Sequence, residues 1–591
     1  MEAPRPRELV RIHGVAHGGQ GVGRGEGEDA DPRTWLVDHA IPGDLVVAER
    51  IHEGKRMLRG VTLEVTEASP DRVEPPCPVA ETCGGCNWQE IAPSAQIELK
   101  RRIVDGALRG IGARVDRVVA APRSLGYRRR ARVHYRHLGD TFELGFLRNR
   151  SHAVVDIDAC PVLEPPLNHA LRRLREVRVL GAEGEVHLLG DGSRVVIGLP
   201  GIRPNDEIEA ALRSILDETL VGVVLRGGRE RVGVGLQSLD VDGGARPPLR
   251  AGPFVFTQAQ SAQNDVLVDL VIAAAKPRGR RVLELYAGAG NFTRALAALA
   301  SRVWALEESR ESVAHLRALA HAHDLPIDAR RGRVEALLTR LEREERGYDV
   351  VVLDPPRKGL GGAASALARV ARERIVHVSC DPATLARDLA TLLGAGAGWS
   401  ITDVTIVDMM PMTSEVEVVV TLVRAGAEST RMSDPVKDLV RAIKKGPLAP
   451  VYVLYGDEPA AIREVVDAIR AAVIPPNDAT AQSMAAFNHE RFDGADVRSA
   501  SQILEACAQV PMLAKVRLVE LQNPDDLGKG RSDDGGASSR EGAIDALCHY
   551  IERPSPSTVL VISGAGIDGA IEAGRRDQEE QARGGVKVQN R

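Results

Sequence analysis

The chain has few aromatic residues and no long apolar run. Phenylalanine, tryptophan and tyrosine together make up 3% of its 591 residues, so side chains on which nucleobases could stack must be few. No apolar run reaches the length of a membrane span, and the first residues, MEAPRPRELVRIHG, lack the apolar core of a secretion signal. We therefore expect a cytoplasmic protein that makes no contact with a membrane.

A strong charge of one sign is also missing. The formal net charge is -5, so any basic surface that contacts nucleic acid must be local. The seven cysteines of a long cytoplasmic chain are more typical of metal binding or catalysis than of disulfides. Apolar residues make up 43%, which is ordinary for a chain with real cores, and the length predicts about three to five domains.

Periodicity divides the chain into segments of different type. Residues 1–70 alternate like strands and are broken by glycines, which predicts a small OB-like β-barrel. Residues 71–253 combine strand patterns with some helix, which predicts a central α+β domain. From 254 to 425 strands alternate with helices, as in a Rossmann-like parallel α/β sheet. Residues 426–436 are interpreted as a linker to a C-terminal α/β segment, 437–591.

Four of the seven cysteines form one pattern. Cys77, Cys83 and Cys86 lie within ten residues, with two glycines between the last two, and Cys160 follows far downstream. Thiolates at such spacing can surround one metal centre, and four of them suit a [4Fe–4S] cluster or zinc. Because the spacing is not that of two C-x2-C units, an iron–sulfur cluster is favoured. The alternative is a set of reduced structural cysteines.

A glycine-containing run, ELYAGAGN, follows an apolar strand and precedes a helix. Its Gly288 and Gly290 would let the backbone approach a nucleotide-like ligand at the helix start. Glu307 ends the next strand, where a carboxylate can accept hydrogen bonds from ribose hydroxyls. A nicotinamide cofactor is the rival ligand, but the third glycine of its G-x-G-x-x-G pattern is missing. S-adenosylmethionine therefore fits better.

Two further strand ends carry reactive groups. Asp354 opens DPPRKG after an apolar strand, a turn that is common in enzymes that methylate nucleobases. Cys380 ends another strand directly before a helix, at the sheet edge where ligands of such folds bind. The helix N-terminus is expected to lower the pKa of the Cys380 thiol and make it nucleophilic. The alternatives are a plain turn and an inert buried cysteine.

A basic strand is expected over residues 128–136, RRRARVHYR. Because side chains alternate between the two faces of a strand, one face carries His134 and four arginines: Arg128, Arg130, Arg132 and Arg136. A basic stripe with an apolar back suits contact with RNA phosphates. A solvated face is the alternative.

Taken together, these motifs resemble the RNA 5-methyluridine methyltransferases. The resemblance covers residues 5–424 and includes HGGQGVGR, CPVAETCGGCNWQ, DIDACP, FTQAQSAQN, ELYAGAGNFT, LDPPRKG, VSCDPATLARDL and DMMPMTSEVE. It is strongest to the branch that modifies large-subunit ribosomal RNA and carries a TRAM barrel and an iron–sulfur cluster. The transfer-RNA branch generally lacks both, so the resemblance implies ribosomal RNA as the partner and leaves transfer RNA as the alternative.

The resemblance also implies a role for each motif. Cys380 would be the nucleophile that adds to carbon 6 of uracil, and Glu417 the base that removes the carbon 5 proton. The four cysteines would hold a [4Fe–4S] cluster. The S-adenosylmethionine site would be lined by Gln258, Tyr286, Gly288, Gly290, Asn291, Glu307 and Asp354. Departures from the family pattern are Arg333, in place of Asp or Asn near the adenine, and Met412 and Glu415 at histidine-type positions.

The C-terminal segment has a separate resemblance. Residues 432–566, with PVYVLYGDEPAAIREVVDAIR and VPMLAKVRLVEL, look like the N-terminal domain of the bacterial DNA polymerase III delta subunit, an AAA+-like clamp-loader component. No G-x-x-x-x-G-K-[ST] loop occurs, so no ATP hydrolysis is expected. The resemblance implies a contact with a clamp loader or a sliding clamp. Residues 528–542 and those after 566 look disordered.

Three functional hypotheses follow. The chain is an active uridine methyltransferase, or an RNA-binding iron–sulfur protein that has lost cofactor affinity through Arg333. In the third hypothesis the delta-like segment is the functional binding module and the methyltransferase is its fused partner.

Overall fold

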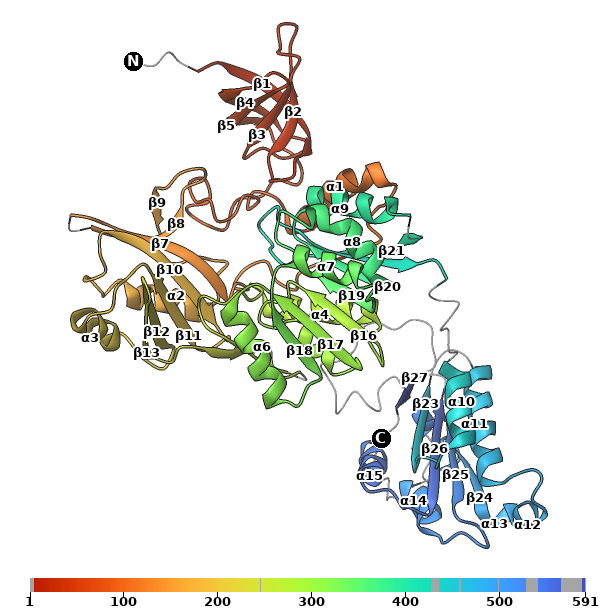
Figure 1. The fold of residues 1–591 in the computed structure, drawn as a ribbon. Helices are drawn as coiled ribbons and strands as arrows, with labels where there is room; N and C mark the ends of the chain where they lie inside the picture. Colours follow the sequence, from red (N-terminus) through yellow and green to blue (C-terminus); the bar gives the residue numbers. More distant parts are fainter. Residues whose placement is uncertain are drawn as a thin grey trace, which may run out of the picture. The chain divides into compact units, whose positions relative to one another are not determined.

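The computed structural model describes residues 5–139, 141–244, 246–396, 398–426, 435–455, 459–497, 499–527, 540–564 and 587–589. The chain divides into two compact units, Met1–Thr430 and Arg431–Arg591 (Figure 1). Within the described ranges, no helix is both long and apolar enough to cross a membrane.

Five strands at the N-terminus close into a barrel of order β1-β2-β3-β5-β4. They are β1 (Arg7–Val15), β2 (Gly21–Gly25), β3 (Thr34–Asp38), β4 (Leu45–Glu53) and β5 (Met57–Glu67). Alternate side chains, among them Val10, Ile12, Trp35 and Val37, fill the interior. The predicted N-terminal β-barrel is confirmed.

The middle of unit 1 contains a seven-stranded sheet of order β13-β12-β11-β10-β7-β8-β9. The strands are β7 (Arg130–Leu138), β8 (Thr141–Leu147), β9 (Val154–Asp156), β10 (Glu183–Gly190), β11 (Val195–Pro200), β12 (Leu220–Gly227) and β13 (Glu230–Gly235). Helices α2 (Pro165–Leu174) and α3 (Asp206–Ser214) share its core, and β14 (Leu239–Val241) pairs with β15 (Leu249–Ala251). The expected basic strand is β7.

The last part of unit 1 is an eight-stranded sheet of order β18-β17-β16-β19-β20-β22-β21-β6. Five neighbours are parallel: β16 (Arg281–Leu285), β17 (Arg302–Glu307), β18 (Ile327–Arg331), β19 (Tyr348–Leu353) and β20 (Ala371–Ser379). The hairpin β21 (Trp399–Val407) and β22 (Glu417–Arg424) adds antiparallel to β20. This is the expected methyltransferase-type α/β fold.

Helices cover both faces of this sheet. Along β19, Val351 and Leu353 pack into one core and Val350 and Val352 into another, so successive residues face opposite sides. The helices that pack in the first core are α7 (Val334–Arg343), α8 (Ala364–Val370) and α9 (Pro382–Gly394). The second takes α4 (Ser261–Ala275) and α5 (Thr293–Ala297), while α6 (Arg310–Ala322) packs on β17 and β18. Burial on both faces explains the continuous apolar runs of these strands.

A helix and a strand that precede β7 belong to this α/β sheet. Helix α1 (Pro93–Leu108) packs on α9 and contributes Val104 and Leu108 to the first core. Strand β6 (Arg117–Val119) pairs with β21 and closes that edge of the sheet. The structure differs here from the expected domain 71–253, which included this helix and this strand. No local sequence pattern indicates this, because the partners, such as Arg117 and Thr405, lie 288 positions apart.

Unit 2 is a five-stranded sheet of order β24-β25-β26-β23-β27. Strands β23 (Val451–Tyr455), β24 (His489–Asp493), β25 (Arg517–Gln522) and β26 (Thr558–Gly564) are parallel. The helices are α10 (Pro435–Lys445), α11 (Pro459–Val473), α12 (Ala479–Ser483), α13 (Ala485–Asn488), α14 (Ala500–Ala508) and α15 (Arg540–Glu552).

The two segments of unit 2 expected to be disordered fall mostly outside the described residues, at 528–539 and 565–586. Two described parts differ from that expectation. Residues 540–542 begin helix α15, and Lys587–Gln589 form strand β27, which pairs antiparallel with β23. An open sheet edge offers unpaired backbone groups to such a short segment, whatever its side chains.

Candidate active site

The carboxyl ends of neighbouring strands bring three candidate groups together. Asp354 follows β19, Cys380 follows β20, and Glu417 is the first residue of β22, which lies beside β20. The three are close enough that the charges of Glu417 and Asp354 act on the Cys380 thiol. Two carboxyl groups and one thiol therefore share a single edge of the sheet.

The Cys380 thiol is protonated in this arrangement. Burial, followed by the charges of Glu417 and Asp354, raises the pKa of Cys380 to about 12 against the opposing effect of Arg357. The prediction that the helix N-terminus lowers this pKa is wrong. Asp381 caps α9 with its own carboxylate, which accepts from the Thr384 backbone N–H at 2.8 Å, and Cys380 lies one residue before this cap.

Glu417 is a buried carboxyl group with one free oxygen. Its side chain is 7% exposed, and Oε1 has no hydrogen-bond partner among the described residues. Burial and the charges of Asp354 and Glu415 raise the pKa of Glu417 well above its ordinary value, while Arg357 opposes them. A carboxyl group with a free oxygen and a raised pKa binds a proton more readily than an ordinary carboxylate.

Arg357 connects these groups and was missed by sequence reasoning. Its guanidinium donates to Glu415 Oε2 at 2.6 Å and also contacts the Cys380 side chain. The cation next to the thiol favours the thiolate. Glu415, at a histidine-type position of the family pattern, is thus engaged in an ion pair. The available signal was the arginine that directly follows the D-P-P turn.

The glycine run after β16 forms a tight turn. Gly288 and Gly290 have φ angles of 55° and 106°, and a Cβ at Gly290 would lie 2.8 Å from Leu316 Cδ2. The Gly288 N–H donates to Glu307 Oε2 at 3.0 Å, and the Ser309 N–H donates to Glu307 Oε1 at 2.6 Å. The carboxylate at the end of β17 therefore fixes the loop that sequence reasoning assigned to a cofactor.

Buried polar groups line the same edge. Asn291 and Asn264 exchange amide hydrogen bonds of 2.8 and 2.9 Å. Tyr286 has a φ of 60°, and its buried hydroxyl lacks a partner among the described residues. Burial raises the pKa of Tyr286 to about 12 and that of Asp354 to about 7. Unsatisfied buried polar atoms are costly, so these are positions that a polar ligand would satisfy.

Gln258 and Arg333 are the two remaining residues that the resemblance places near the cofactor. Gln258 precedes α4, and its backbone carbonyl accepts from Arg129 Nε at 3.0 Å. Arg333 is the N-cap residue of α7 but makes no capping hydrogen bond with its side chain. That side chain is 69% exposed, and its Nε lies 3.7 Å from Glu335 Oε2. The Arg333 guanidinium lies in solvent and does not fill the glycine loop.

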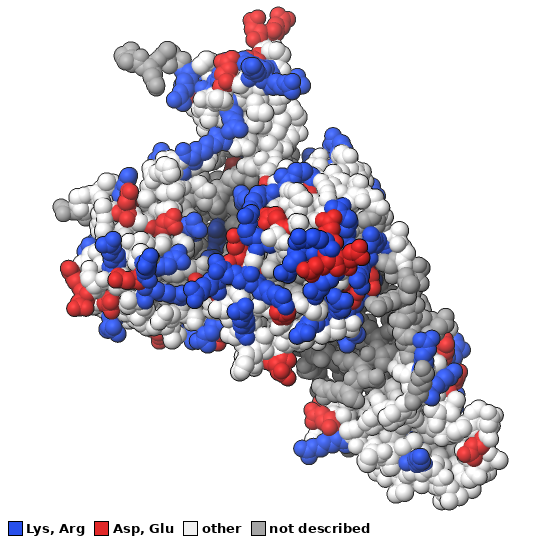
Figure 2. Space-filling model, in the orientation of Figure 1, with Lys and Arg blue, Asp and Glu red and all other residues white. Residues whose placement is uncertain are grey.

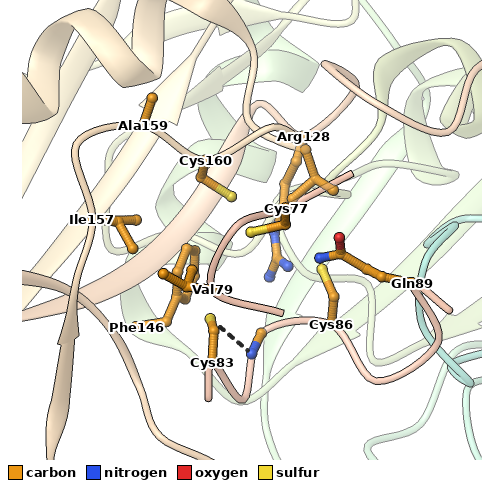
Figure 3. A pocket seen from close by; sticks show the side chains of 12 residues that line it. Cys77, Val79, Cys83, Cys86, Gln89, Arg128, Phe146, Ile157, Ala159 and Cys160 are labelled. Atoms are coloured by element: carbon orange, nitrogen blue, oxygen red, sulfur yellow. Dashed lines mark hydrogen bonds between the residues drawn. The ribbon is translucent and has the colours of Figure 1, made fainter. Parts of the chain in front are cut away.

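Four cysteines line one pocket of the middle domain: Cys77, Cys83, Cys86 and Cys160 (Figure 3). Its other walls include Phe146, Ile157 and Arg128. Burial raises the pKa of Cys83 and of Cys160, and it raises the pKa of Cys86 to about 12. The neighbouring cysteines act in the same direction, and Arg128 opposes them. In the part of the chain that is described, no group of three or more His, Cys, Asp or Glu side chains is arranged to hold a metal ion.

The arginines of the basic stripe differ in their surroundings. Arg132 is 63% exposed and Arg136 is 39% exposed, with carboxylates of the neighbouring β10 at 3.9 and 3.5 Å. Arg128 lies against the cysteine pocket. Arg130 is largely buried, donates to the carbonyls of Val255 and Pro253, and lies 5.8 Å from the ring centre of Phe256. Only part of the stripe is free for a partner.

Phe256 is a second residue that sequence reasoning missed. Its side chain is 66% exposed, in a chain with seven phenylalanines. An exposed ring backed by an arginine is a platform on which a base can stack. It is the first residue of FTQAQSAQN, which was the available signal.

A cavity of about 520 Å³ adjoins the site. Residues from the barrel, the cysteine segment, the basic strand and the β21–β22 connection line it, and its basic side chains are His39, Arg128, Arg132, Arg150 and Arg357. Figure 2 shows lysine and arginine side chains spread over the visible face of unit 1, with acidic side chains among them. The cavity therefore gathers five basic side chains beside two acidic ones, Asp38 and Glu415, which pair with Arg150 and Arg357.

Comparison with known proteins gives two family matches. The family model for tRNA (Uracil-5-)-methyltransferase matches residues 250–425, and that for DNA polymerase III, delta subunit, matches residues 452–572. A solved structure, Pyrococcus abyssi tRNA (uracil-54, C5)-methyltransferase in complex with S-adenosyl-L-homocysteine, is similar with a TM-score of 0.56 and 25% identity. It covers 70% of this chain and 99% of that one.

Curated relatives match 70% of this chain. The 23S rRNA (uracil(1939)-C(5))-methyltransferase RlmD of Halomonas elongata is 34% identical over an alignment of 434 residues, and the match covers 70% of this chain and 88% of that protein. The enzyme of the same name from Pseudomonas entomophila is 33% identical over 70% of this chain and 92% of its own length. By these matches and by the fold of unit 1, the chain belongs to the RNA uracil-5-methyltransferase family.

Proposed function

We propose that unit 1 methylates carbon 5 of a uridine in large-subunit ribosomal RNA, with S-adenosylmethionine as the methyl donor. The observation that carries this proposal is the meeting of Cys380, Asp354 and Glu417 at one sheet edge beside a basic cavity. Relatives named as 23S rRNA methyltransferases favour ribosomal RNA. Transfer RNA is the alternative, because the solved relative is named for it.

The reaction needs a nucleophile because carbon 5 of uracil is itself unreactive. The Cys380 thiol releases its proton to solvent as the target base enters, and the adjacent Arg357 guanidinium stabilises the thiolate. The sulfur adds to carbon 6, and the ring electrons move into an enolate. Carbon 5 attacks the methyl carbon of the donor, the sulfur–methyl bond breaks, and S-adenosylhomocysteine leaves as a neutral thioether. The target base must leave its stack to reach Cys380.

A base then completes the reaction. Glu417 removes the proton from carbon 5, the carbon 5–carbon 6 double bond re-forms, and the Cys380 sulfur leaves as a thiolate. The free Oε1 and the raised pKa of Glu417 suit this step. Asp354, Gly288, Asn291 and Glu307 would hold the donor, since their turn and buried polar atoms fit a nucleoside-like ligand.

The proposed RNA methylation is tested by labelled methyl transfer. The full chain, methyl-labelled S-adenosylmethionine and purified 23S ribosomal RNA should give label at carbon 5 of one uridine, mapped by mass spectrometry of nuclease fragments. Transfer RNA in the same assay is the comparison. Label in transfer RNA alone would replace ribosomal RNA as the substrate, and label in neither would overturn the proposal.

The four-cysteine pocket is proposed to hold a [4Fe–4S] cluster. Thiolates that share one zinc ion, each about 2.3 Å from the metal, must lie within about 4 Å of one another. A cluster gives each thiolate its own iron, so the sulfurs spread around a wider space. Four thiols around an apolar pocket, without a close group for a single ion in the described residues, fit the cluster better. Its role would be structural, since methyl transfer needs no redox step.

Anaerobically purified protein is expected to be brown and to contain iron without zinc. Cys83→Ser should remove the colour and loosen residues 75–165, because cluster binding is coupled to local folding. Iron and zinc per chain, with proteolysis of that region, measure this. Cys507→Ser is the matched control, since Cys507 is a buried free cysteine of unit 2. Stoichiometric zinc in strictly anaerobic protein would contradict the assignment.

Arg132 is expected to contribute to RNA affinity and not to chemistry. Its exposed side chain lines the basic cavity, so Arg132→Glu should weaken RNA binding and reduce the slope of log Kd against log salt by about one unit. The value of kcat at saturating RNA should change little. Arg213→Glu, on the exposed face of α3, is the control. An unchanged salt slope would show that Arg132 does not meet a phosphate.

A second function is proposed for unit 2, a contact with a sliding clamp or clamp loader. The family match supports it, together with a cluster of exposed apolar side chains: Phe487, Val510, Met512 and Leu513, which are 57%, 83%, 49% and 76% exposed. The Asn488 side-chain amide fixes the Met512 backbone, with two hydrogen bonds of 2.7 Å. Such exposed apolar patches mark interaction sites.

Removal of residues 432–591 is expected to leave methylation unchanged and to abolish clamp binding. The family resemblance is complete before this segment, and unit 1 is compact by itself. Methylation kinetics and melting of the truncated chain measure the first part, and binding of purified sliding clamp measures the second. The full chain with Leu513→Ser should lose clamp binding alone. A truncated chain that loses activity or melts markedly earlier would show that the units work together.

A further inference from the structure

The segment that leads to Glu417 is held mainly from outside its own hairpin. This catalytic loop, residues 408–416, joins β21 to β22. From α1, Lys100 Nζ donates to Asp408 Oδ1 at 2.5 Å, and Gln96 Oε1 accepts from the Met412 N–H at 2.9 Å. The Tyr127 hydroxyl donates to the Pro411 carbonyl at 2.9 Å. The position of the loop therefore depends on groups far away in the sequence.

Asn87 is the residue through which the barrel reaches this loop. One N–H of its amide donates to the Gly18 carbonyl of the barrel, and the other donates to Ser414 Oγ, both at 3.0 Å. Its Oδ1 accepts from the Ser414 backbone N–H at 2.9 Å. The reversed amide would set an oxygen against the Gly18 carbonyl and an N–H against the Ser414 N–H, so this orientation alone satisfies both sides.

The barrel approaches Asn87 through a loop in which one position, Gly19, has no room for a side chain. This barrel loop, residues 16–20, includes Gly19 with a φ of 90°, and a Cβ there would lie 2.2 Å from Asn87 Nδ2. The Gly19 carbonyl accepts from Trp88 Nε1 at 3.1 Å. Beside it, His17 Nε2 lies 3.4 Å from Asp381 Oδ2, one residue after Cys380. The barrel loop thus contacts both the cysteine segment and the reactive edge.

We propose that Asn87 is a positioning residue for methylation: its amide ties the barrel loop to the catalytic loop and so sets Glu417 against the base held by Cys380. The proposal rests on the proposed function of Cys380 and Glu417. It assigns the barrel a part in placing the base-bearing loop, in addition to RNA contact. Asn87 directly follows Cys86, so the cysteine segment presents this amide.

Two kinds of substitution separate the contact of Asn87 with the barrel loop from its contact with the catalytic loop. In Asn87→Asp, one oxygen can still accept from the Ser414 N–H and the other can accept from its hydroxyl, but neither can donate to Gly18. Asn87→Asp should therefore free the barrel loop alone. Gly19→Ala should disturb both sides, because its Cβ would lie 2.2 Å from Asn87 Nδ2 and 3.0 Å from Ser414 Oγ. Asn87→Ala loses both sides. Gly27→Ala is the control, because Gly27 is a barrel glycine with a φ of 116° and no atom near its Cβ position.

We expect Asn87→Asp to raise KM for RNA several-fold with kcat within about twofold of wild type. Gly19→Ala should raise KM and lower kcat together, because its Cβ crowds both Asn87 and Ser414. Asn87→Ala should in addition lower kcat about tenfold or more, because a small displacement of Glu417 slows proton removal. Ser414→Ala, which removes only the hydroxyl, should show a weaker form of the same loss. Gly27→Ala brings a similar backbone strain without a contact to Asn87, so it should keep the wild-type KM and kcat. Melting curves and iron content show whether each variant is folded.

Trapping with RNA that contains 5-fluorouridine distinguishes positioning from general damage. Fluorine cannot leave as a proton, so the covalent adduct forms without Glu417. Asn87→Ala should trap at the wild-type rate and yet turn over ordinary RNA slowly. If trapping and turnover fall equally, or turnover stays at the wild-type value, the proposal fails. If wild-type protein does not trap at all, the proposed function of Cys380 fails instead.

Discussion

Cys380→Ala is expected to abolish uridine methylation, with kcat at least about 10³-fold below that of wild type. Without the thiol, nothing adds to carbon 6, and carbon 5 remains too weak a nucleophile to attack a methyl group. The fold should persist, because Cys380 is only partly buried at a strand end and no backbone pairing depends on it. We expect Tm to stay within about 4 °C of wild type.

Covalent trapping measures this result directly. Wild-type protein with 5-fluorouridine RNA and the methyl donor should give a species of higher mass that survives denaturation, and Cys380→Ala should give none. Cys548→Ala is the matched control, since Cys548 is an exposed cysteine of unit 2. An adduct that persists in Cys380→Ala would refute the assignment of the nucleophile.

Glu417→Gln is expected to stop the reaction after methyl transfer. The variant should add Cys380 to ordinary uridine and accept the methyl group, but it lacks the base that removes the carbon 5 proton. Turnover should fall by about 10² to 10⁴-fold, and a methylated covalent adduct should accumulate. Mass spectrometry of the denatured complex identifies that adduct. Free methylated RNA released at the wild-type rate would show that another group is the base.

The pH dependence of the two proteins should differ. Burial and nearby carboxylates raise the pKa of Glu417 well above its ordinary value, so release of product by wild type should speed up as pH rises through that pKa. Glu417→Gln should show no such rise. For stability, a carboxyl group with a raised folded pKa is most favourable below its unfolded pKa, near about 4.3, and this contribution is lost as pH increases. Glu417→Gln should therefore raise Tm at pH 8 more than at pH 4.

Local patterns in the sequence were sufficient for the architecture and the family. Strand alternation with glycine turns predicted the N-terminal barrel, and the alternation of apolar strands with helices predicted the methyltransferase sheet. The order of motifs, from HGGQGVGR to DMMPMTSEVE, carried the family resemblance that the relatives bear out. These features are visible because side-chain periodicity and strand-end turns are properties of neighbouring residues.

Other features depend on contacts that only the fold creates. The pKa of Cys380 was predicted in the wrong direction, because burial and two carboxylates from other strands outweigh the nearby helix end. Arg130 reads as part of an RNA-binding stripe, yet the carbonyls at 253 and 255 engage it. The roles of α1 and β6 in the catalytic sheet were likewise invisible.

The sequence by itself determined which chemical groups this protein has and in what order they follow one another. The tertiary structure decided which of them meet: Asn87 with Gly18 and Ser414, and Arg357 with Glu415. Asn87 and Ser414 are 327 positions apart, and periodicity extends over only a few turns or one strand. Burial, charge coupling and long-range hydrogen bonds arise when distant segments pack, and that packing sets the protonation and the position of each reactive group.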